Sequence, residues 1–313
     1  MDKKILILGS KGLVGTSVKK VLSSSENIGE VVSSTREDTN LFDFKETSKL
    51  ISTTKPNVII NAAAKVGGIY ANNTKRTEFI LENLKINLNL LESCIPFPDI
   101  KIINLGSSCI YPLNAENPIK EDYFMSGKLE PTNSPYAMAK LTAIEMSDAM
   151  TKQYGHEIIN LMPTNLYGPN DNFSLTDSHV IPGLIHRMHI AKEGNEDEFM
   201  IWGSGKPLRE FLYVDDLADC INFLINKKVD SSLINVGSGE EISIFELASL
   251  IKEILSFEGS LKFDNSKPDG NPRKLIDSTL INSLGWKSKT KLEEGIKLTY
   301  EWFQNNLSEK RVS

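Results

Sequence analysis

A chain of 313 residues is long enough to bury a large hydrophobic core, and it allows one large domain or two of ordinary size. Its 41 acidic residues outnumber its 35 lysines and arginines, and the formal net charge of −6 argues against general nucleic-acid binding. Hydrophobic residues make up 40% of the chain and charged residues 24%, so a disordered or collagen-like protein is excluded.

Three cysteines, Cys94, Cys109 and Cys220, stand far apart and show neither zinc-site spacing nor an even count for a disulfide framework. A reducing compartment fits this pattern best. The apolar run near the N-terminus, Ile5 to Leu8, is too short for a signal peptide core, and no run approaches the roughly 20 apolar residues of a membrane helix. We therefore predict a cytoplasmic protein with no metal site, no nucleic-acid partner and no membrane contact.

Short apolar runs alternate with longer helical stretches along the first half of the chain. Runs of about four to six residues that are apolar on both faces are typical of buried parallel strands. They are Ile5 to Leu8, Val31 with Val32, Val58 to Ile60, Ile102 to Leu105, and Ile158 to Met162. The stretches Leu13 to Ser23 and Asn72 to Cys94 are long enough for crossover helices. This alternation predicts an α/β fold with a doubly wound parallel sheet of the Rossmann type.

The alternation loosens after residue 168, where prolines and glycines become frequent. We therefore predict a dinucleotide-binding domain over residues 1–168, with a returning segment near 212–238. A smaller α/β lobe would take residues 169–211 and 239–313 and bind the substrate.

A glycine-rich turn follows the first predicted strand, with Gly9, Gly12 and Gly15 in the spacing G-x-x-G-x-x-G. Glycines there allow a tight turn, close approach of the backbone to a pyrophosphate, and close packing of the next helix. Free amides at the start of that helix would then face the anion. A glycine turn without a ligand is the alternative, which the position in the first strand–helix unit disfavours.

The end of the second predicted strand indicates which dinucleotide is bound. Where an NAD site usually has an acidic residue, the chain has Ser33-Ser34-Thr35-Arg36. A guanidinium suits the additional phosphate of NADP. Glu37 and Asp38 follow directly, which leaves a solvated surface arginine as the alternative.

Tyr136 and Lys140 stand four residues apart in a stretch with helical spacing of apolar residues, so they share one helix face. An ammonium beside a phenol favours the phenolate, and we therefore expect a lowered pKa for Tyr136. Ser107 follows the fourth predicted strand, where open α/β sheets bind ligands, and its hydroxyl would bond a substrate carbonyl alongside the tyrosine. An ordinary amphipathic helix is the alternative.

These residues resemble the extended short-chain dehydrogenase/reductases that act on nucleotide sugars, and longer blocks are similar to the GDP-L-fucose synthase family. The blocks occur in order from residue 5 to beyond 275 and are long and specific. They are Asn61-Ala-Ala-Ala-Lys-Val-Gly-Gly-Ile, Gly106-Ser-Ser-Cys-Ile-Tyr-Pro, Pro163-Thr-Asn-Leu-Tyr-Gly-Pro, Ser178-His-Val-Ile-Pro, Trp202-Gly-Ser-Gly-Lys-Pro-Leu-Arg-Glu-Phe-Leu and Lys267-Pro-Asp-Gly-Asn-Pro-Arg-Lys-Leu.

The resemblance implies two chemistries in one pocket: inversion at C3 and C5 of GDP-4-keto-6-deoxy-D-mannose, then reduction of the C4 ketone with NADPH. It implies that Cys109 is the base and His179 the acid of the epimerisation, and that Ser107, Tyr136 and Lys140 serve the reduction. A thiol and an imidazole both exchange protons near pH 7. If the segment from Ser107 to Cys109 is extended, both side chains point to one face. Structural roles for the cysteine and the histidine are the alternatives.

The resemblance also implies binding residues and a homodimer built from the helices near 72–94 and 136–154. Substrate contacts would come from Arg187, Trp202, Arg209 and Asp269, with Lys206 adding charge nearby. Cofactor contacts would come from Gly9, Ser10, Lys11, Gly12, Leu13, Val14, Gly15, Arg36, Asn40, Leu41, Leu105, Gly106, Ser107, Ser108, Lys140, Pro163, Thr164, Asn165, Leu166 and His179.

Three other functions remain as alternatives at this point. A nucleotide-sugar 4,6-dehydratase commonly has a glutamate beside its serine or threonine, and Ser107-Ser108-Cys109-Ile110 contains none. A 4-epimerase would hold NAD tightly, which Arg36 disfavours. A non-catalytic NADP-binding regulator would be expected to lack part of the catalytic set, and no member of that set is missing.

Overall fold

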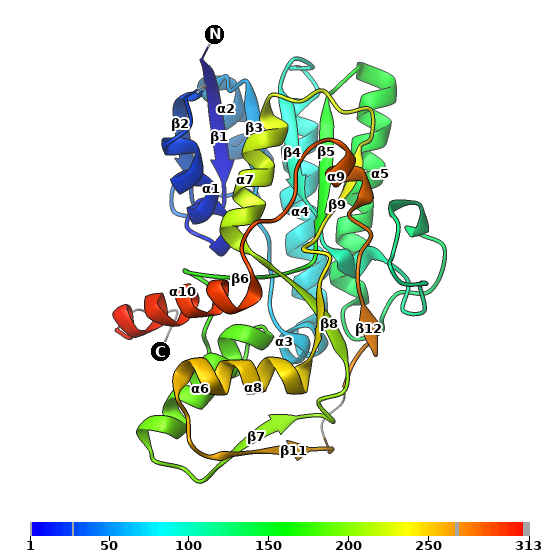
Figure 1. Cartoon of the computed structure of the whole chain (residues 1–313). Helices are drawn as coiled ribbons and strands as arrows, with labels where there is room; N and C mark the ends of the chain where they lie inside the picture. Colours follow the sequence, from blue (N-terminus) through cyan, green and yellow to red (C-terminus); the bar gives the residue numbers. More distant parts are fainter. Residues whose placement is uncertain (1, 27, 267–268, 309–313) are drawn as a thin grey trace.

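The computed structural model describes residues 2–26, 28–266 and 269–308 (Figure 1). Its central feature is a six-stranded sheet in which every neighbouring pair of strands is parallel, in the order β2-β1-β3-β4-β5-β9. The strands are β1 (Lys3–Leu8), β2 (Ile28–Ser34), β3 (Val58–Asn61), β4 (Lys101–Leu105), β5 (Ile158–Pro163) and β9 (Leu233–Val236). The predicted doubly wound parallel sheet is confirmed.

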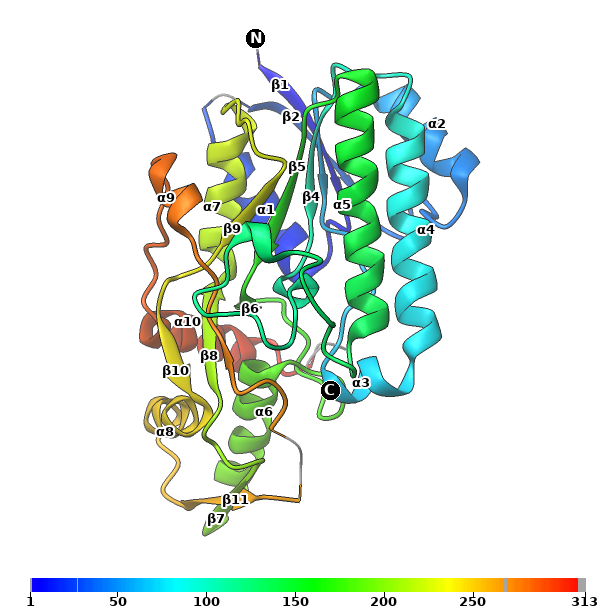
Figure 2. The same ribbon diagram turned by 90° about the vertical axis from the view of Figure 1, so that its right-hand side faces the viewer.

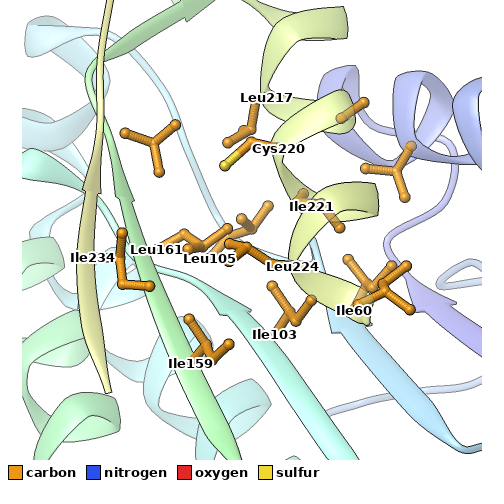
Figure 3. Packing of buried hydrophobic residues seen from close by; sticks show 14 of the residues in the cluster. Ile60, Ile103, Leu105, Ile159, Leu161, Leu217, Cys220, Ile221, Leu224 and Ile234 are labelled. Atoms are coloured by element: carbon orange, nitrogen blue, oxygen red, sulfur yellow. The ribbon is translucent and has the colours of Figure 1, made fainter. Parts of the chain in front are cut away.

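Both faces of this sheet are buried, which explains the continuous apolar runs. Successive residues of β1 alternate between the two cores: Ile5 and Ile7 belong to one apolar cluster, Leu6 and Leu8 to the other. Figure 3 shows the first cluster, in which Ile103 and Ile159 of the sheet face Leu217, Ile221 and other residues of the helix α7 (Val214–Ile225).

Helices cover each face of the sheet as the alternation predicts. The first face carries α1 (Leu13–Ser23), α7 (Val214–Ile225) and α9 (Thr279–Ser283), and the second carries α2 (Phe44–Thr54), α4 (Arg76–Cys94) and α5 (Ser134–Tyr154). Figure 2 shows α4 and α5 side by side on the second face. The stretch Asn72 to Cys94, expected to hold a crossover helix, is helical from Arg76 to Cys94 but is interrupted at Lys75, where α3 (Ile69–Thr74) ends. The Lys75 backbone is not helical, and its ammonium pairs with Asp177 at 3.1 Å.

A second group of elements lies beyond the carboxyl ends of the strands (Figure 1). Its strands are β6 (Asn165–Tyr167), β8 (Leu208–Tyr213), β10 (Glu241–Ser243) and β12 (Arg273–Lys274), with β7 (Glu198–Trp202) and β11 (Ser260–Asp264) paired separately. Its helices are α6 (Val180–Glu193), α8 (Ile244–Leu255) and α10 (Leu292–Asn305). Aromatic residues such as Tyr167, Phe173 and Phe303 fill its core.

Segments from the second half of the chain return to the central sheet. Strand β9 pairs with β5, and α7 packs on the first face. Ile281 and Trp286, from the range expected in the second lobe, pack in the same apolar cluster as α7. The division into 1–168 with 212–238, and 169–211 with 239–313, stays a prediction.

The strand order reverses between β1 and β3, so the chain leaves these two neighbouring strands in opposite lateral directions. Open α/β sheets bind ligands outside the carboxyl ends of the strands at such a point. Within the described residues, no helix has the length and apolar character needed to cross a membrane.

Candidate active site

The glycine turn forms a close-packed cradle at the carboxyl end of β1. Gly9 has φ +73°, and a Cβ there would lie 2.7 Å from the backbone of Ala63 after β3. A Cβ on Gly15 would lie 2.2 Å from the carbonyl oxygen of Gly9. Both positions therefore require glycine, because backbone atoms occupy the space of any side chain.

The first turn of α1 has no side-chain cap, and it begins directly after Gly12. Its first amide groups therefore have no partner within the helix and, with the helix dipole, favour an anion. Ser10 is tied to β2, with its backbone amide and hydroxyl both donating to the carbonyl of Ser34 at 3.1 Å. The cradle fits the pyrophosphate of a dinucleotide.

The turn after β2 leaves Arg36 exposed, and its two acidic neighbours are engaged elsewhere. Asp38 accepts hydrogen bonds from the backbone and hydroxyl of Thr35, at 2.9 and 2.7 Å, and Glu37 pairs with Lys11 of the glycine turn. Among the described residues, Arg36 forms no ion pair with a carboxylate. The acidic neighbours therefore do not neutralise it, which favours the phosphate-binding interpretation.

The other expected cofactor residues lie at the carboxyl ends of three parallel strands. Asn40 and Leu41 follow β2, and the amide of Asn89 fixes the Leu41 carbonyl at 2.9 Å. Segment 105–108 begins at the last residue of β4, and segment 163–166 begins at the last residue of β5. Thr164 and Asn165 donate hydrogen bonds to the Glu210 carbonyl at 3.1 and 2.8 Å. All these segments share one edge of the sheet with the glycine cradle.

Lys140 is a buried cation, 2% exposed, on α5. Its Nζ donates to the Leu105 carbonyl at 2.6 Å and lies 5.7 Å from the centre of the Tyr136 ring. Among the described residues this carbonyl is its only hydrogen-bond acceptor, so two of its three N–H donors are left for a bound molecule. Burial lowers the pKa of Lys140 to about 8.

The expected lowering of the Tyr136 pKa is wrong. Burial raises the pKa of Tyr136 well above its usual range, negative charge on Cys109 acts in the same direction, and a hydrogen bond with Ser107 opposes both. Desolvation disfavours the charged form of each group, so it outweighs the mutual effect of ammonium and phenol. Tyr136 is therefore a neutral phenol at pH 7, a proton donor.

Ser107 lies two residues after β4, in an extended conformation, and caps the 3-10 helix η1 (Ser108–Ile110). Its hydroxyl oxygen accepts a hydrogen bond from the Cys109 amide at 3.2 Å. The condition that 107–109 is extended is therefore not met, because the cap turns the chain at Ser108. Ser107 keeps its hydroxyl proton for donation, and it remains beside Tyr136.

Two residues that the sequence analysis did not select surround the Cys109 thiol. The side-chain amide of Asn133 donates to Cys109 Sγ at 3.5 Å, and Lys274 Nζ lies 3.7 Å from the same sulfur. Lys274, in β12, lies within the last of the sequence blocks, whereas Asn133 lies just before α5 and outside all of them. No local pattern distinguishes them from their polar neighbours.

His179 stands at the N-terminus of α6 and is exposed to solvent. In the described part of the chain its ring makes no hydrogen bond. The adjoining carbonyl of Asp177 accepts from the Gly68 amide at 3.1 Å, and Gly67 in turn lies beside Phe79, whose ring meets Tyr136 edge-on. The loop after β3 therefore lies between the His179 segment and the Tyr136 helix.

Two half-buried arginines lie in the second group of elements. The Arg187 guanidinium stacks 4.8 Å from the centre of the exposed Trp202 ring and donates to the Met200 carbonyl at 3.2 Å. Arg209, on β8, donates to the carbonyls of Leu208 and Asp269. Over the described residues neither arginine pairs with a carboxylate, so both remain available to an anion.

Asp269 is an expected substrate contact, and its side chain also holds the loop that carries Ser204. Its two carboxylate oxygens accept from the backbone and hydroxyl of Ser204, at 2.7 and 2.8 Å, and these bonds lower its pKa. They fix the loop that follows Trp202 and contains Lys206. Lys267 and Pro268, at the start of the last sequence block, lie outside the described residues.

The sequence model of the NAD dependent epimerase/dehydratase family matches residues 5–237 of this chain. The chain belongs to this family. It is 45% identical to GDP-L-fucose synthase 1 of Arabidopsis thaliana, over 97% of this chain and 94% of that protein, and 41% identical to GDP-L-fucose synthase of Escherichia coli, over 97% of each. Among solved structures, a GDP-L-fucose synthetase from Naegleria fowleri bound to NADP superposes with a TM-score of 0.90 at 31% identity, covering 99% of this chain and 97% of that one.

Within the NAD dependent epimerase/dehydratase family, the chain is therefore one of the GDP-L-fucose synthases. The glycine cradle, the free arginine after β2 and the buried Lys140 with two unoccupied donors fit NADPH. In the described residues, no group of three or more histidine, cysteine or acidic side chains is placed to hold a metal ion.

Proposed function

We propose that the protein converts GDP-4-keto-6-deoxy-D-mannose to GDP-L-fucose, by epimerisation at C3 and C5 followed by NADPH-dependent reduction of the C4 ketone. The observation that carries this proposal is the cluster of Ser107, Cys109, Tyr136 and Lys140 at the carboxyl ends of β4 and its neighbours, in a chain whose relatives are GDP-L-fucose synthases.

NADPH supplies the hydride that C4 receives. Gly9, Gly12 and Gly15 with the N-terminus of α1 would hold its pyrophosphate, Arg36 its additional phosphate, and Lys140 would donate to it from the buried end of the site. Segments 105–108 and 163–166 line the same edge of the sheet.

Epimerisation uses the acidity that the C4 ketone confers on C3 and C5. Cys109 takes the proton from carbon, the electron pair moves onto the ketone oxygen, and His179 returns a proton to the opposite face. Donors from Ser107 and Tyr136 stabilise the enolate oxygen.

Reduction uses the same oxygen. Tyr136 gives its phenolic proton to the C4 oxygen as the hydride arrives, and Ser107 donates a hydrogen bond to it. The raised pKa of Tyr136 keeps the proton on the phenol until then. The Lys140 ammonium, 5.7 Å from the ring centre, stabilises the resulting phenolate.

Substrate binding is assigned to the second group of elements. Arg187 and Arg209 would hold the diphosphate, because both guanidiniums lack carboxylate partners among the described residues. Trp202 would pack against the base or sugar, and Asp269 would accept from the nucleotide with its remaining lone pairs.

One reaction in deuterated water tests the function. NADPH and GDP-4-keto-6-deoxy-D-mannose are supplied, and the product is examined by NMR. Deuterium at both C3 and C5 of GDP-L-fucose is the expected result. NADPH oxidation without deuterium at those carbons would identify a simple 4-ketoreductase, and the absence of NADPH oxidation would favour a regulator or another family activity.

Arg36→Ala is expected to raise the dissociation constant of NADPH about 10- to 100-fold, because the additional phosphate loses a charge-assisted hydrogen bond of about 1.5–3 kcal/mol. NADH lacks that phosphate, and its affinity for the variant should change little. Calorimetric titration of both cofactors against both proteins measures the difference. An equal loss for NADH and NADPH would show that Arg36 does not recognise the phosphate.

The rate of reduction is expected to fall as the pH rises through about 8. The pKa of Lys140, lowered to about 8, leaves the ammonium charged below this pH and neutral above it, so support for the Tyr136 phenolate is lost at high pH. Single-turnover oxidation of NADPH at a series of pH values gives the profile. In Lys140→Arg the guanidinium stays charged, so the remaining activity should no longer titrate there; a wild-type profile flat to about pH 10 would contradict the role.

We further propose a homodimer formed by α4 and α5. Leu81, Leu88 and Met138 on these helices are 49, 40 and 46% exposed, and a concave patch between the helices is lined by Arg76, Thr77, Ile80, Ser134, Pro135 and Met138. Figure 2 shows both helices on one outer side of the molecule. A second copy would cover this apolar surface.

The three cysteines are free thiols, which supports the cytoplasm as the proposed compartment.

Leu88→Asp is expected to convert the dimer to a monomer, because the carboxylate would be desolvated in the interface. Leu298→Asp is the matched control, since Leu298 is also 40% exposed and belongs to α10, a helix that lies apart from α4 and α5 (Figure 2). Light scattering after size-exclusion chromatography gives both masses. A dimeric Leu88→Asp variant would place the interface elsewhere.

A further inference from the structure

The ammonium of Lys274 lies against the one thiol of the site. Its Nζ is 3.7 Å from Cys109 Sγ, and this sulfur is its only hydrogen-bond partner among the described residues. Neighbouring Arg273 differs, because its guanidinium pairs with Glu241 at 2.8 Å. Lys274 is half-buried and forms no ion pair with a described carboxylate. Its charge is therefore not neutralised by an acidic side chain.

The backbone holds Lys274 in this position from both sides. Strand β12 pairs in parallel with β8, with Lys274 opposite Arg209. The next amide, of Leu275, donates to Asn117 Oδ1 at 2.7 Å, and that of Ile276 donates to the buried carboxylate of Glu210 at 3.1 Å. The position of the ammonium thus follows from a fixed strand and does not depend on a free loop.

Few other charged groups of the described residues face the thiol. From the start of α5 it meets the neutral Asn133 amide, 3.5 Å away, and Tyr136, which is uncharged because burial raises its pKa. Glu130 accepts from the backbone amides of Thr132 and Asn133, at 3.0 and 3.1 Å, and so orients the segment that carries Asn133. Two donors, one of them cationic, therefore point at the sulfur, and donors to a sulfur favour its thiolate.

We propose that Lys274 is a positioning residue for epimerisation, whose ammonium holds Cys109 as the thiolate that removes the substrate protons. This rests on the proposed function. In the step itself, the C–H bond at C3 or C5 breaks, the S–H bond of Cys109 forms, and the carbon electron pair moves to the C4 oxygen. Lys274 transfers no proton; it stabilises the sulfur while the sulfur is anionic. Arg209, the proposed diphosphate contact, lies opposite Lys274 in the strand pair of β12 and β8.

Alkylation of Cys109 by iodoacetamide tests the proposal without substrate. Cys94 and Cys220 are fully buried, so the reactive thiol of the folded protein is Cys109, with Cys109→Ser as the background. The rate is measured over a series of pH values and divided by its high-pH plateau, which removes any change in access to the sulfur. In Lys274→Met the relative rate at pH 7 should fall about tenfold, with the midpoint about one pH unit higher.

The matched variants separate charge from structure. Lys274→Arg should retain most of the relative rate, and Arg273→Met should behave as wild type, since its side chain pairs at the surface. Lys274→Gln provides the same comparison if the methionine variant does not fold. Wild-type pH dependence in the neutral variants would overturn the proposal.

Deuterium exchange at C3 and C5 distinguishes this proposal from the function itself. It should fall in Lys274→Met by about the same factor as alkylation at pH 7. Loss of exchange with unchanged alkylation would mean that Lys274 acts on the substrate, which overturns the proposed role. If wild-type protein exchanges no deuterium while the alkylation shift is observed, the proposed function fails and the thiolate contact stands.

Discussion

Cys109→Ser is expected to reduce deuterium incorporation at C3 and C5 by about 10²- to 10⁴-fold, the usual contribution of a general base. A serine hydroxyl fills nearly the same space, but it ionises far less readily than a thiol and cannot take a carbon-bound proton near pH 7. The contacts from Asn133 and Lys274 would then meet a neutral hydroxyl. Exchange is followed by NMR in deuterated water with oxidised NADP present, so that reduction does not interfere.

Binding of NADPH provides the first control, since the glycine cradle and Arg36 are unchanged in the variant. Cys94→Ala provides the second: this thiol is buried in the apolar cluster on the second face of the sheet, so the change should lower stability and leave exchange intact. A Cys109→Ser variant that loses NADPH affinity as strongly as exchange would count against the assignment of the base.

Tyr136→Phe is expected to slow the hydride step by about 10²- to 10⁴-fold while epimerisation continues. The phenyl ring keeps its edge-on contact with Phe79, at 6.2 Å between ring centres, so the change removes only the hydroxyl. Without the phenolic proton, only the hydrogen bond from Ser107 stabilises negative charge on the C4 oxygen. Stopped-flow measurement of NADPH oxidation gives the hydride rate, and NMR shows the epimerised ketone accumulating.

Tyr154→Phe is the matched control for this change. Tyr154 ends the same helix, α5, and is 43% exposed at the opposite end from the site. Its substitution should leave both rates unchanged. If Tyr136→Phe loses deuterium exchange and reduction to the same extent, Tyr136 serves both steps equally and the proposed division of labour is wrong.

Local sequence patterns were sufficient to predict much of the fold and the edge of the sheet at which the site lies. Strands buried on both faces need apolar residues at nearly every position, so Ile5 to Leu8 and Ile158 to Met162 could be identified without tertiary information. The glycines of the first turn are equally local, because backbone atoms of the same turn exclude a side chain from Gly15. Parallel strands bring their carboxyl ends to one edge, and the sequence therefore predicted that Ser107 lies near Tyr136.

The ionisation states of the site did not follow from sequence spacing. The four-residue interval between Tyr136 and Lys140 correctly placed both on one helix face, but it indicated the wrong direction for the phenol pKa. The cost of burying a charge depends on all the elements packed around it, whereas spacing along a helix reports only one neighbour. The break at Lys75 has a similar origin, since the ion pair with Asp177 joins segments 102 residues apart.

The environment of Cys109 depends on still more distant contacts. Lys274 lies 165 residues away along the chain, in a two-residue strand whose position is set by pairing with β8 and by the buried Glu210. A strand of that length leaves no periodic pattern in the sequence. Residue types and their order along each strand therefore predict where ligands bind, whereas the charge beside the reactive sulfur arises only when separate strands fold against one another.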